Sequence, residues 1–325
     1  MSDPLLELRG LSTHYESARG TRVTRAVDDV SLTVERGTTL GIVGESGSGK
    51  STLALSIMRL LPPAARIVGG QIRFEGEDLL GKSPAEMRAI RGKRIAMILQ
   101  DPMASLNPLF TIGDQVSESL RVHEGASRKS AWTRARRLLE AVRISAPAAR
   151  MTEFPHQMSG GMRQRIVGAI AVACEPRLLI ADEPTTSLDL TIQAQYLSLL
   201  RDLQREHHLA MIFITHNLGI VARMCDAVAV MYAGRVVEAG PIREIFNKPA
   251  HPYTRALLES VPRLTDDSHA RLPAIDGQPP DPSAPPPGCA FHPRCPQRRP
   301  RCEAEAPPVT RVGVGHTARC WLHAP

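Results

Sequence analysis

The segment GESGSGKS at residues 44–51 has the residue types and the spacing of a phosphate-binding loop. It fits the pattern G-x-x-x-x-G-K-[ST], and the apolar run TLGIVG at 39–44 predicts a strand that leads into it. Its glycines let the backbone turn so that N–H groups converge on phosphate oxygens at the start of a helix. We expect Lys50 to reach the β and γ phosphates of a nucleotide and Ser51 to offer its hydroxyl to Mg²⁺. The nucleotide contacts predicted in this segment are Gly44, Glu45, Ser46, Gly47, Ser48, Gly49, Lys50, Ser51 and Thr52.

Two neighbouring carboxylates follow the apolar run LLIA at 178–181. A phosphate-binding loop needs a second source of metal ligands, which is normally an Asp at the end of a buried strand. Asp182 is predicted to hold Mg²⁺, usually through water, and Glu183 is predicted to act as the base toward the attacking water. Taken alone, the pair would be interpreted more simply as two solvated acids in a loop.

A second predicted anion site lies in the segment MSGGMRQR at 158–165. Ser159 is predicted to be the N-cap of a helix that opens with Gly160 and Gly161. Because the N–H groups at a helix N-terminus bind anions, the chain carries two predicted phosphate-binding segments.

The pattern of apolar residues predicts the elements that position these segments. Alternation of apolar and polar residues from Leu5 to Val34 indicates short antiparallel strands joined by a loop. Helical spacing from Ser51 to Leu61 predicts a helix that ends at the pair Pro62-Pro63. The runs LLIA and MIFIT (211–215), separated by a helical stretch, predict a parallel α/β sheet. The apolar face of that stretch consists of Ile192, Tyr196, Leu199 and Leu203.

In chain order, these features resemble the ATP-binding cassette of ABC transporters. The set consists of the phosphate loop, Gln100 after IAMIL, the SGG segment, Asp182-Glu183, Ser187-Leu188-Asp189 and His216. Such an ordered set is far more specific than any single motif, and the resemblance covers roughly residues 5–262. It implies an α/β P-loop NTPase (RecA-like) fold with an N-terminal antiparallel β subdomain and a helical subdomain at about residues 101–165. The cassette is predicted to span residues 1–262, followed by a small Pro- and Cys-rich extension at 263–325.

The resemblance also implies roles for single residues. Tyr15 is expected to stack on adenine, Gln100 to join Mg²⁺ and the lytic water to the transporter interface, and His216 to contact the γ-phosphate. Catalysis would then depend on Glu183 and His216. The Mg²⁺ ligands would be Ser51, Gln100 and Asp182.

In this family each nucleotide lies between the P-loop of one cassette and the signature segment of another. The residues expected to serve the partner's ATP are Ser159, Gly160, Gly161 and Asp189. The family pattern is usually L-S-G-G-Q, and here Met158 and Met162 occupy its first and fifth positions. We expect a working signature because the serine and both glycines are present.

Two later stretches, NKPAHPYTRALLESVPR (247–263) and GCAFHPRCP (288–296), resemble the C-terminal signature of oligopeptide/dipeptide importer ATPases. This implies an ATPase that energises uptake of di- or oligopeptides together with a second, often different, cassette subunit. Two membrane permeases and an extracytoplasmic peptide-binding protein would complete the transporter. Nickel importers share this ancestry, so nickel or another small solute is the alternative cargo.

Four cysteines, Cys289, Cys295, Cys302 and Cys320, lie in the C-terminal extension, where 12 of the chain's 27 prolines fall between 273 and 308 and disfavour a regular core. Cytosolic thiols are usually reduced, and structural zinc commonly uses closer cysteine pairs. Similar spacings in this importer family are associated with a 4Fe-4S cluster, which the resemblance therefore implies as a cofactor. Zinc, with His292 or His316 as a replacement ligand, and unliganded cysteines remain alternatives.

Composition sets broader limits. The formal charge is +7, but only 4% of residues are aromatic, which gives little support to a cassette ATPase that acts on nucleic acid. No apolar run approaches the roughly 20 residues that span a bilayer, and no secretory signal can be recognised. We therefore expect a cytoplasmic protein, and the resemblance to importer ATPases implies that it is peripheral, on the cytoplasmic face of the plasma membrane.

Overall fold

The computed structural model describes residues 3–17, 22–186, 188–262 and 274–324. The chain forms two compact units, each assembled from separate segments. The first unit comprises Met1–Leu5, Val34–Thr38 and Leu79–Ile214, and the second comprises Leu6–Thr33, Thr39–Asp78 and Thr215–Pro325. Ser187 is itself a gap in the described residues. The predicted domain boundary at 262/263 lies at the edge of another gap, residues 263–273. The boundary therefore stays a prediction.

Three parallel strands form the centre of the first unit. They are β6 (Ile95–Ile98), β7 (Leu178–Asp182) and β8 (Ala210–Ile214). β7 lies between the other two, with Leu178 opposite both Ile95 and Ala210. Strands that are covered on both faces are continuously apolar, as LLIA and MIFI are, so the predicted parallel α/β arrangement is confirmed.

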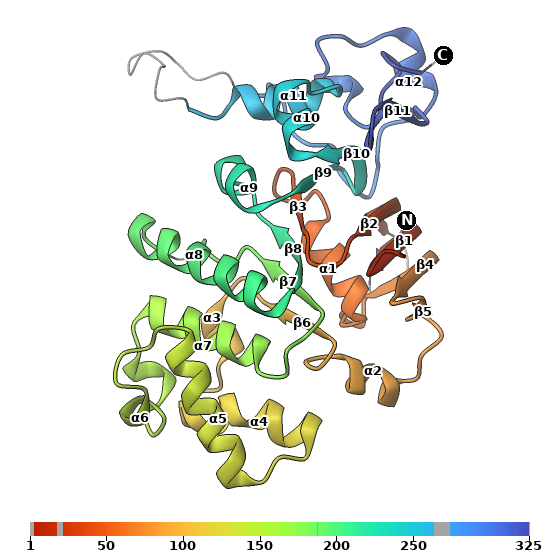
Figure 1. The fold of residues 1–325 in the computed structure, drawn as a ribbon. Helices are drawn as coiled ribbons and strands as arrows, with labels where there is room; N and C mark the ends of the chain where they lie inside the picture. Colours follow the sequence, from red (N-terminus) through yellow and green to blue (C-terminus); the bar gives the residue numbers. More distant parts are fainter. Residues whose placement is uncertain (1–2, 18–21, 187, 263–273, 325) are drawn as a thin grey trace. The chain divides into compact units, whose positions relative to one another are not determined.

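Helices make up the rest of the first unit (Figure 1). They are α2 (Pro84–Ile90), α3 (Pro102–Ser105), α4 (Ile112–Glu124), α5 (Arg128–Ala141), α6 (Pro147–Arg150), η1 (Pro155–Gln157), α7 (Gly160–Val172) and α8 (Leu190–His207). Leu120 of α4 and Ala131 of α5 are buried against Ala173, which follows α7. α8 buries Tyr196, Leu199 and Leu203, as the helical spacing predicted.

The second unit contains an antiparallel sheet and a mixed set of strands. The antiparallel sheet has the order β2 (Val23–Val34), β1 (Leu6–Glu16), β4 (Ala65–Phe74) and β5 (Glu77–Asp78), and it confirms the N-terminal prediction. In the mixed set, β3 (Thr39–Val43) runs parallel to β9 (Ala227–Tyr232). β9 pairs antiparallel with β10 (Arg235–Pro241), which pairs antiparallel with β12 (His316–Arg319), and β11 (Val309–Gly313) lies beyond β12.

The helix after the glycine loop, α1 (Lys50–Met58), ends earlier than its apolar spacing predicted. Arg59 adopts a left-handed conformation with φ of 51°, and its N–H donates to the carbonyls of Leu55 and Ser56. Leu60, expected on the apolar face, is exposed instead. The prediction that the proline pair stops the helix was therefore wrong, because a left-handed C-cap satisfies the last carbonyls one turn sooner.

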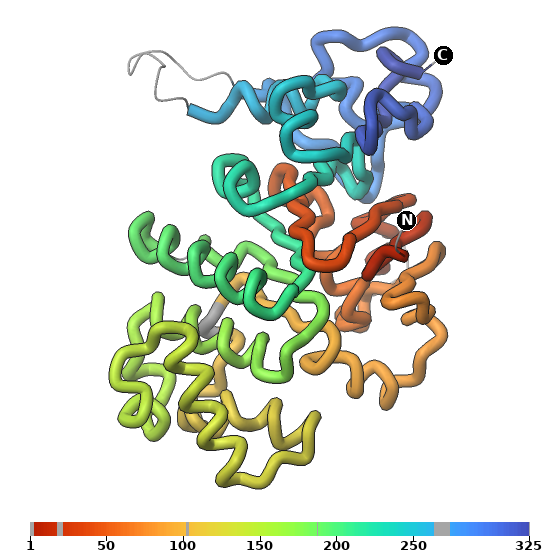
Figure 2. Tube along the Cα trace, viewed as in Figure 1, coloured from red at the N-terminus to blue at the C-terminus, as the bar shows by residue number. Residues whose placement is uncertain are grey.

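The remaining helices of the second unit are α9 (Leu218–Met224), α10 (Ile242–Asn247), α11 (Pro252–Glu259), η2 (His292–Arg294) and α12 (Pro300–Ala304). Between residues 274 and 308, only η2 and α12 are regular, as the proline content predicted. The chain then returns to β10 through β12, and Figure 2 shows this C-terminal segment in blue. Buried His316 joins Glu238 of β10 through a 2.7 Å contact between Nε2 and Oε1.

Within the described part of the chain, no helix combines the length and the apolar character that crossing a membrane requires.

Candidate nucleotide site and cysteine pocket

The glycine loop between β3 and α1 is shaped by two glycines that no other residue could replace without strain. Gly49 has φ of 101°, and a Cβ there would lie 2.1 Å from the carbonyl oxygen of Ala26. At Gly44 a Cβ would lie 2.1 Å from the carbonyl oxygen of Met231. Side chains at either position would collide with backbone, so the second unit itself fixes the path of the loop.

Lys50, the first residue of α1, points back into this loop. Its Nζ donates to the carbonyl of Gly44 at 2.8 Å and to the carbonyl of Glu45 at 2.9 Å, and it lies 3.3 Å from Oγ of Ser48. Gly49 is the N-cap of α1 and provides no capping side chain. A helix start without a side-chain cap is the arrangement that accepts phosphate in a P-loop.

Two other predicted site residues of the second unit lie beside the loop. The hydroxyl of Tyr15, at the end of β1, is 3.4 Å from Oγ1 of Thr52 in α1. The N–H of Thr215 donates to the carbonyl of Ile42 in β3, which brings exposed His216 to the strand end from which the loop leaves. Ligands of parallel α/β sheets bind at such strand ends.

The carboxylates at the end of β7 form the candidate site of the first unit. Asp182 is buried and Glu183 is half-buried, with φ of 45°. Nε2 of Gln100 donates to Oε2 of Glu183 at 3.2 Å, and Oγ1 of Thr186 donates to the same oxygen at 2.9 Å. The structure thus brings the predicted site residues Gln100 and Glu183 together, and it adds Thr186. A non-glycine residue in this left-handed region stores strain that is typical of functional sites.

The predicted signature segment begins α7 with Ser159 as N-cap, and its Oγ accepts from the N–H of Met162. Gly160 is exposed, and a Cβ there would meet no atom within 4 Å. Gly161 instead faces Ile192 of α8, 2.7 Å from where its Cβ would be. Asp189 caps α8 by accepting from two backbone N–H groups at 3.0 Å each.

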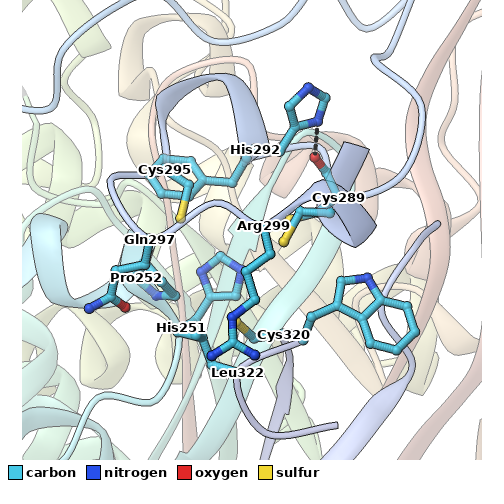
Figure 3. A pocket seen from close by; sticks show the side chains of 12 residues that line it. His251, Pro252, Cys289, His292, Cys295, Gln297, Arg299, Cys320 and Leu322 are labelled. Carbon is cyan, nitrogen blue, oxygen red and sulfur yellow. Dashed lines mark hydrogen bonds between the residues drawn. The ribbon is translucent and has the colours of Figure 1, made fainter. Parts of the chain in front are cut away.

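The four C-terminal cysteines line one pocket of the second unit, although they are spread over 32 residues of sequence (Figure 3). Cys289 and Cys295 are half-buried, and Cys302 and Cys320 are buried. Burial, and to a smaller extent the three other cysteines, raise the pKa of Cys289 to about 11. The pKa values of Cys295 and Cys320 are raised mainly by burial as well. Without a cation these groups therefore stay protonated.

His251 of the same pocket was not recognised from the sequence. Burial lowers its pKa to about 3, so the ring is neutral. Nδ1 accepts from the N–H of Tyr253 at 3.0 Å, which places the ring proton on Nε2. Nε2 is buried and has no hydrogen-bond partner among the described residues. A single histidine gives no sequence signal for a buried nitrogen without a partner. His251 does lie in the stretch 247–263 that resembles the importer signature, and this could have drawn attention to it.

Four thiols in one pocket are the donor set of a tetrathiolate cluster or zinc site. In the part of the chain that the structure describes, however, no group of three or more His, Cys, Asp or Glu side chains is arranged to hold a metal ion. His316 lies outside the pocket with Nε2 bound to Glu238, which does not fit the replacement zinc ligand of the sequence interpretation, whereas His292 lines the pocket with Nδ1 3.0 Å from the carbonyl of Cys289.

A strand, a glycine loop curled around a lysine and an uncapped helix define a P-loop nucleotide-binding protein. Comparison with known families extends this. Residues 27–186 match the model of the ABC transporter family, and residues 237–302 match that of the oligopeptide/dipeptide transporter C-terminal region.

Three relatives illustrate the similarity. The Bacillus subtilis dipeptide transport ATP-binding protein DppD is 50% identical over 321 residues, which cover 98% of this chain and 95% of the relative. A probable peptide ABC transporter ATP-binding protein of Sinorhizobium fredii has the same identity and coverage. The Haemophilus influenzae oligopeptide transport ATP-binding protein OppD is 46% identical and covers 99% and 98%.

Solved structures of ATP-binding cassettes are similar to this chain as well. An ATP-binding cassette in a dimeric post-hydrolysis state with ADP and Pi has a TM-score of 0.66 and 26% identity, over 73% of this chain and 99% of that one. The cassette cbiO1 of a Clostridium perfringens ABC transporter complex has a TM-score of 0.63 and 28% identity, over 76% and 92%. The chain belongs to the ABC transporter ATP-binding proteins that carry the oligopeptide/dipeptide transporter C-terminal region.

Proposed function

We propose that this ABC ATPase binds and hydrolyses ATP to energise the import of di- or oligopeptides. The observation that carries the proposal is the similarity to peptide-transport ATP-binding proteins over 98% of the chain, which includes the C-terminal region outside the ATP site. Relatives with 46–50% identity are named for peptides, dipeptides or oligopeptides, and this favours peptide over nickel as the cargo.

Within the second unit, the loop and α1 are proposed to bind the phosphates. The carbonyls of Gly44 and Glu45 now hold Nζ of Lys50, and ATP would offer this ammonium its β- and γ-phosphate oxygens instead. Tyr15 would stack on adenine, a role supported by its hydroxyl contact with Thr52. Ser51 would bind Mg²⁺, and His216 would contact the γ-phosphate.

Within the first unit, Asp182 is proposed to hold Mg²⁺ together with Gln100, and Glu183 is proposed to be the base. The two hydrogen bonds that Oε2 of Glu183 accepts, from Gln100 and Thr186, orient the carboxylate, which would take a proton from the attacking water. Mg²⁺, when bound, would neutralise charge on the phosphates.

Glu183→Gln tests this assignment because it preserves the shape of the side chain but removes its basicity. We expect ATP binding to be kept and steady-state hydrolysis to fall by about 10²- to 10⁴-fold. Thr186→Ala is the matched control for the orienting contact, with a loss of about tenfold at most. Unchanged hydrolysis in Glu183→Gln would remove this residue from the role of base.

Two cassettes are proposed to enclose two ATP molecules, so that Ser159, Gly160, Gly161 and Asp189 serve the partner's nucleotide. The exposure of Gly160 and the open space around it support this proposal, because nothing in its own unit requires a glycine there. Closure on ATP and opening after hydrolysis would then drive transport.

The proposed membrane partners are two permeases that hold the ATPase at the cytoplasmic face, with a peptide-binding protein on the other side. A candidate contact is the loop at 107–110, whose Leu109 and Phe110 are 81% and 55% exposed. Gln115 holds this loop rigidly, because its amide donates to the carbonyls of Asn107 and Phe110 and accepts from the N–H of Asn107. Exposed apolar side chains on a fixed loop are typical of an interaction site.

The cysteine pocket is proposed to bind a 4Fe-4S cluster through Cys289, Cys295, Cys302 and Cys320. Four thiols line the pocket, and four cysteine thiolates are the usual ligands of such a cluster. His251 lines the same pocket, and its buried Nε2–H, which has no partner among the described residues, would be available to stabilise a bound group. The cluster would supply folding energy to a proline-rich segment.

Anaerobic purification tests the cofactor. We expect brown protein with visible charge-transfer absorbance and about four irons per chain, and a loss of colour in Cys302→Ser. Colourless protein with stoichiometric zinc would contradict the cluster.

Transport is tested by reconstituting the ATPase with its permeases in proteoliposomes and measuring uptake of a labelled dipeptide. Uptake should require ATP and disappear with Glu183→Gln. Co-purification with nucleic acid or ribosomes, and never with a permease, would overturn the transport proposal.

A further inference from the structure

A buried ion pair joins the cysteine pocket to the P-loop. Arg294, which immediately precedes Cys295, binds Glu45 of the loop through two parallel hydrogen bonds, 2.7 Å from Nη1 to Oε2 and 3.0 Å from Nη2 to Oε1. The Arg294 side chain is only 5% exposed and that of Glu45 is 26% exposed. The two residues are 249 positions apart in sequence, and both belong to the second unit.

Arg294 is held from every side of its guanidinium group. Besides the two bonds to Glu45, Nη1 donates to the hydroxyl of Tyr232 at 3.3 Å. Nη2 donates to the carbonyl of Ile275 at 3.2 Å, and Nε donates to that of Asp276 at 2.9 Å. The hydrogen bonds to Glu45 are the main reason that the pKa of Arg294 is raised. All five donors of the side chain therefore have acceptors, which fixes its position.

Glu45 is held at its backbone as well. Its N–H donates to the hydroxyl of Tyr253 at 3.0 Å, and its carbonyl accepts from Nζ of Lys50 at 2.9 Å. The ring of Tyr253 packs against Tyr232 and Phe291, with centroids 4.6 and 5.3 Å away. One loop residue thus connects the phosphate-binding lysine with an aromatic cluster next to the cysteines.

The geometry of the cysteine segment determines where Arg294 lies. The carbonyl of Cys289 accepts from both the N–H and Nδ1 of His292, and the N–H of Cys295 donates to the carbonyl of His292. These bonds build the single turn of η2 that carries Arg294 between two pocket cysteines. Phe291, which lines the pocket, is buried against Tyr253. A change in the spacing of the thiols would therefore move the guanidinium group.

We propose that Arg294 is a positioning residue that couples the cysteine pocket to nucleotide binding. It holds Glu45, and through Glu45 the loop and Lys50, in the conformation that receives phosphate. The state of the cysteines, liganded or free, thereby sets the affinity for ATP. This inference rests on the proposed ATP-binding function of the loop.

The first test compares ATP affinity in Arg294→Gln and in wild type, with a fluorescent ATP analogue displaced by ATP. Loss of a bidentate contact to a charged group should raise the Kd for ATP by about tenfold. Arg298→Gln is the matched control, because it removes the same charge from an exposed side chain of the same segment and should leave the Kd unchanged. Arg294→Lys keeps the charge but loses the fork, so its Kd should lie between those of wild type and Arg294→Gln.

Coupling is reciprocal, so nucleotide must also act on the cysteines. In protein whose cysteines carry no metal, we expect ATP to slow alkylation of Cys289 and Cys295 by iodoacetamide, measured for each cysteine by mass spectrometry, at least threefold in wild type and Arg298→Gln. In Arg294→Gln the rates with and without ATP should be equal. A merely structural arginine would change the melting temperature without abolishing this response.

Tyr253→Phe keeps the test decisive if Arg294→Gln fails to fold. It removes only the hydroxyl that accepts from Glu45 and leaves the aromatic packing, and it should raise the Kd for ATP about threefold. The inference is overturned if wild type binds ATP in a Lys50-dependent manner while the folded Arg294 or Tyr253 variants bind it equally well. Failure of wild type to bind ATP would instead refute the proposed function.

Discussion

The chain begins two helices with glycine-rich, anion-binding segments, and the two segments differ in what surrounds them. In the P-loop, Gly44 and Gly49 touch backbone of their own unit, and Lys50 is bound by the loop itself. At the signature, Gly160 is exposed and faces open space. The first segment is packed against its own unit, whereas at Gly160 a Cβ would meet none of the described residues within 4 Å. This contrast is what a composite site with one half on each of two molecules requires.

Of the substitutions that compare the two segments, Gly49→Ala should have the largest effect on ATP binding. The new Cβ would lie 2.1 Å from the carbonyl oxygen of Ala26, at a φ that alanine rarely adopts, so the loop must change shape. We expect a loss of ATP affinity of at least about 100-fold, measured by isothermal titration calorimetry. Gly160→Ala is the control at the open position, and it should bind ATP as wild type does. Equal losses in both variants would show that the two segments are not different in kind.

Gly160→Arg tests the partner role of the signature. The arginine has room in its own unit, so the isolated chain should keep its melting temperature and its affinity for ATP. In the assembled transporter the side chain would occupy the place of the partner's γ-phosphate, and ATPase activity should fall by about 100-fold. If the assembled variant hydrolyses ATP normally, the open space around residue 160 does not belong to a nucleotide site.

Local motifs could be predicted from the sequence, and distant contacts could not. The loop at 44–51 and the capped start of α7 depend on neighbouring residues, whose spacing is visible in one dimension. The ion pair between Glu45 and Arg294 joins residues 249 positions apart, and no periodicity relates them. The helix after the loop was predicted too long, because apolar spacing does not reveal that Arg59 adopts a left-handed conformation. The cysteines were found by their type, but their shared pocket with His251 emerges only in three dimensions.

Tyr15→Ala, beside the P-loop, should have a smaller effect on ATP binding than Gly49→Ala. Base stacking on an aromatic ring is worth about 1–3 kcal/mol, so the Kd for ATP should rise about tenfold. Tyr15→Phe keeps the ring but removes the hydroxyl that contacts Thr52, and it should bind ATP almost as tightly as wild type. If Tyr15→Ala and Tyr15→Phe weaken ATP binding equally, Tyr15 acts through its hydroxyl, and the stacking role is wrong.

The smallest effect concerns Asp189, which could serve its own chain, its partner, or both. As the N-cap of α8 it accepts from the N–H groups of Thr191 and Ile192, so Asp189→Ala should cost about 1 kcal/mol of the free energy of unfolding. Asparagine caps helices about as well as aspartate, and Asp189→Asn should therefore restore stability in thermal unfolding. ATPase activity of the assembled transporter separates the roles, because a carboxylate needed across the dimer interface leaves Asp189→Asn stable but slow. Full activity in Asp189→Asn would confine Asp189 to its own helix and leave the open segment at Gly160 as the part of this chain that serves the partner.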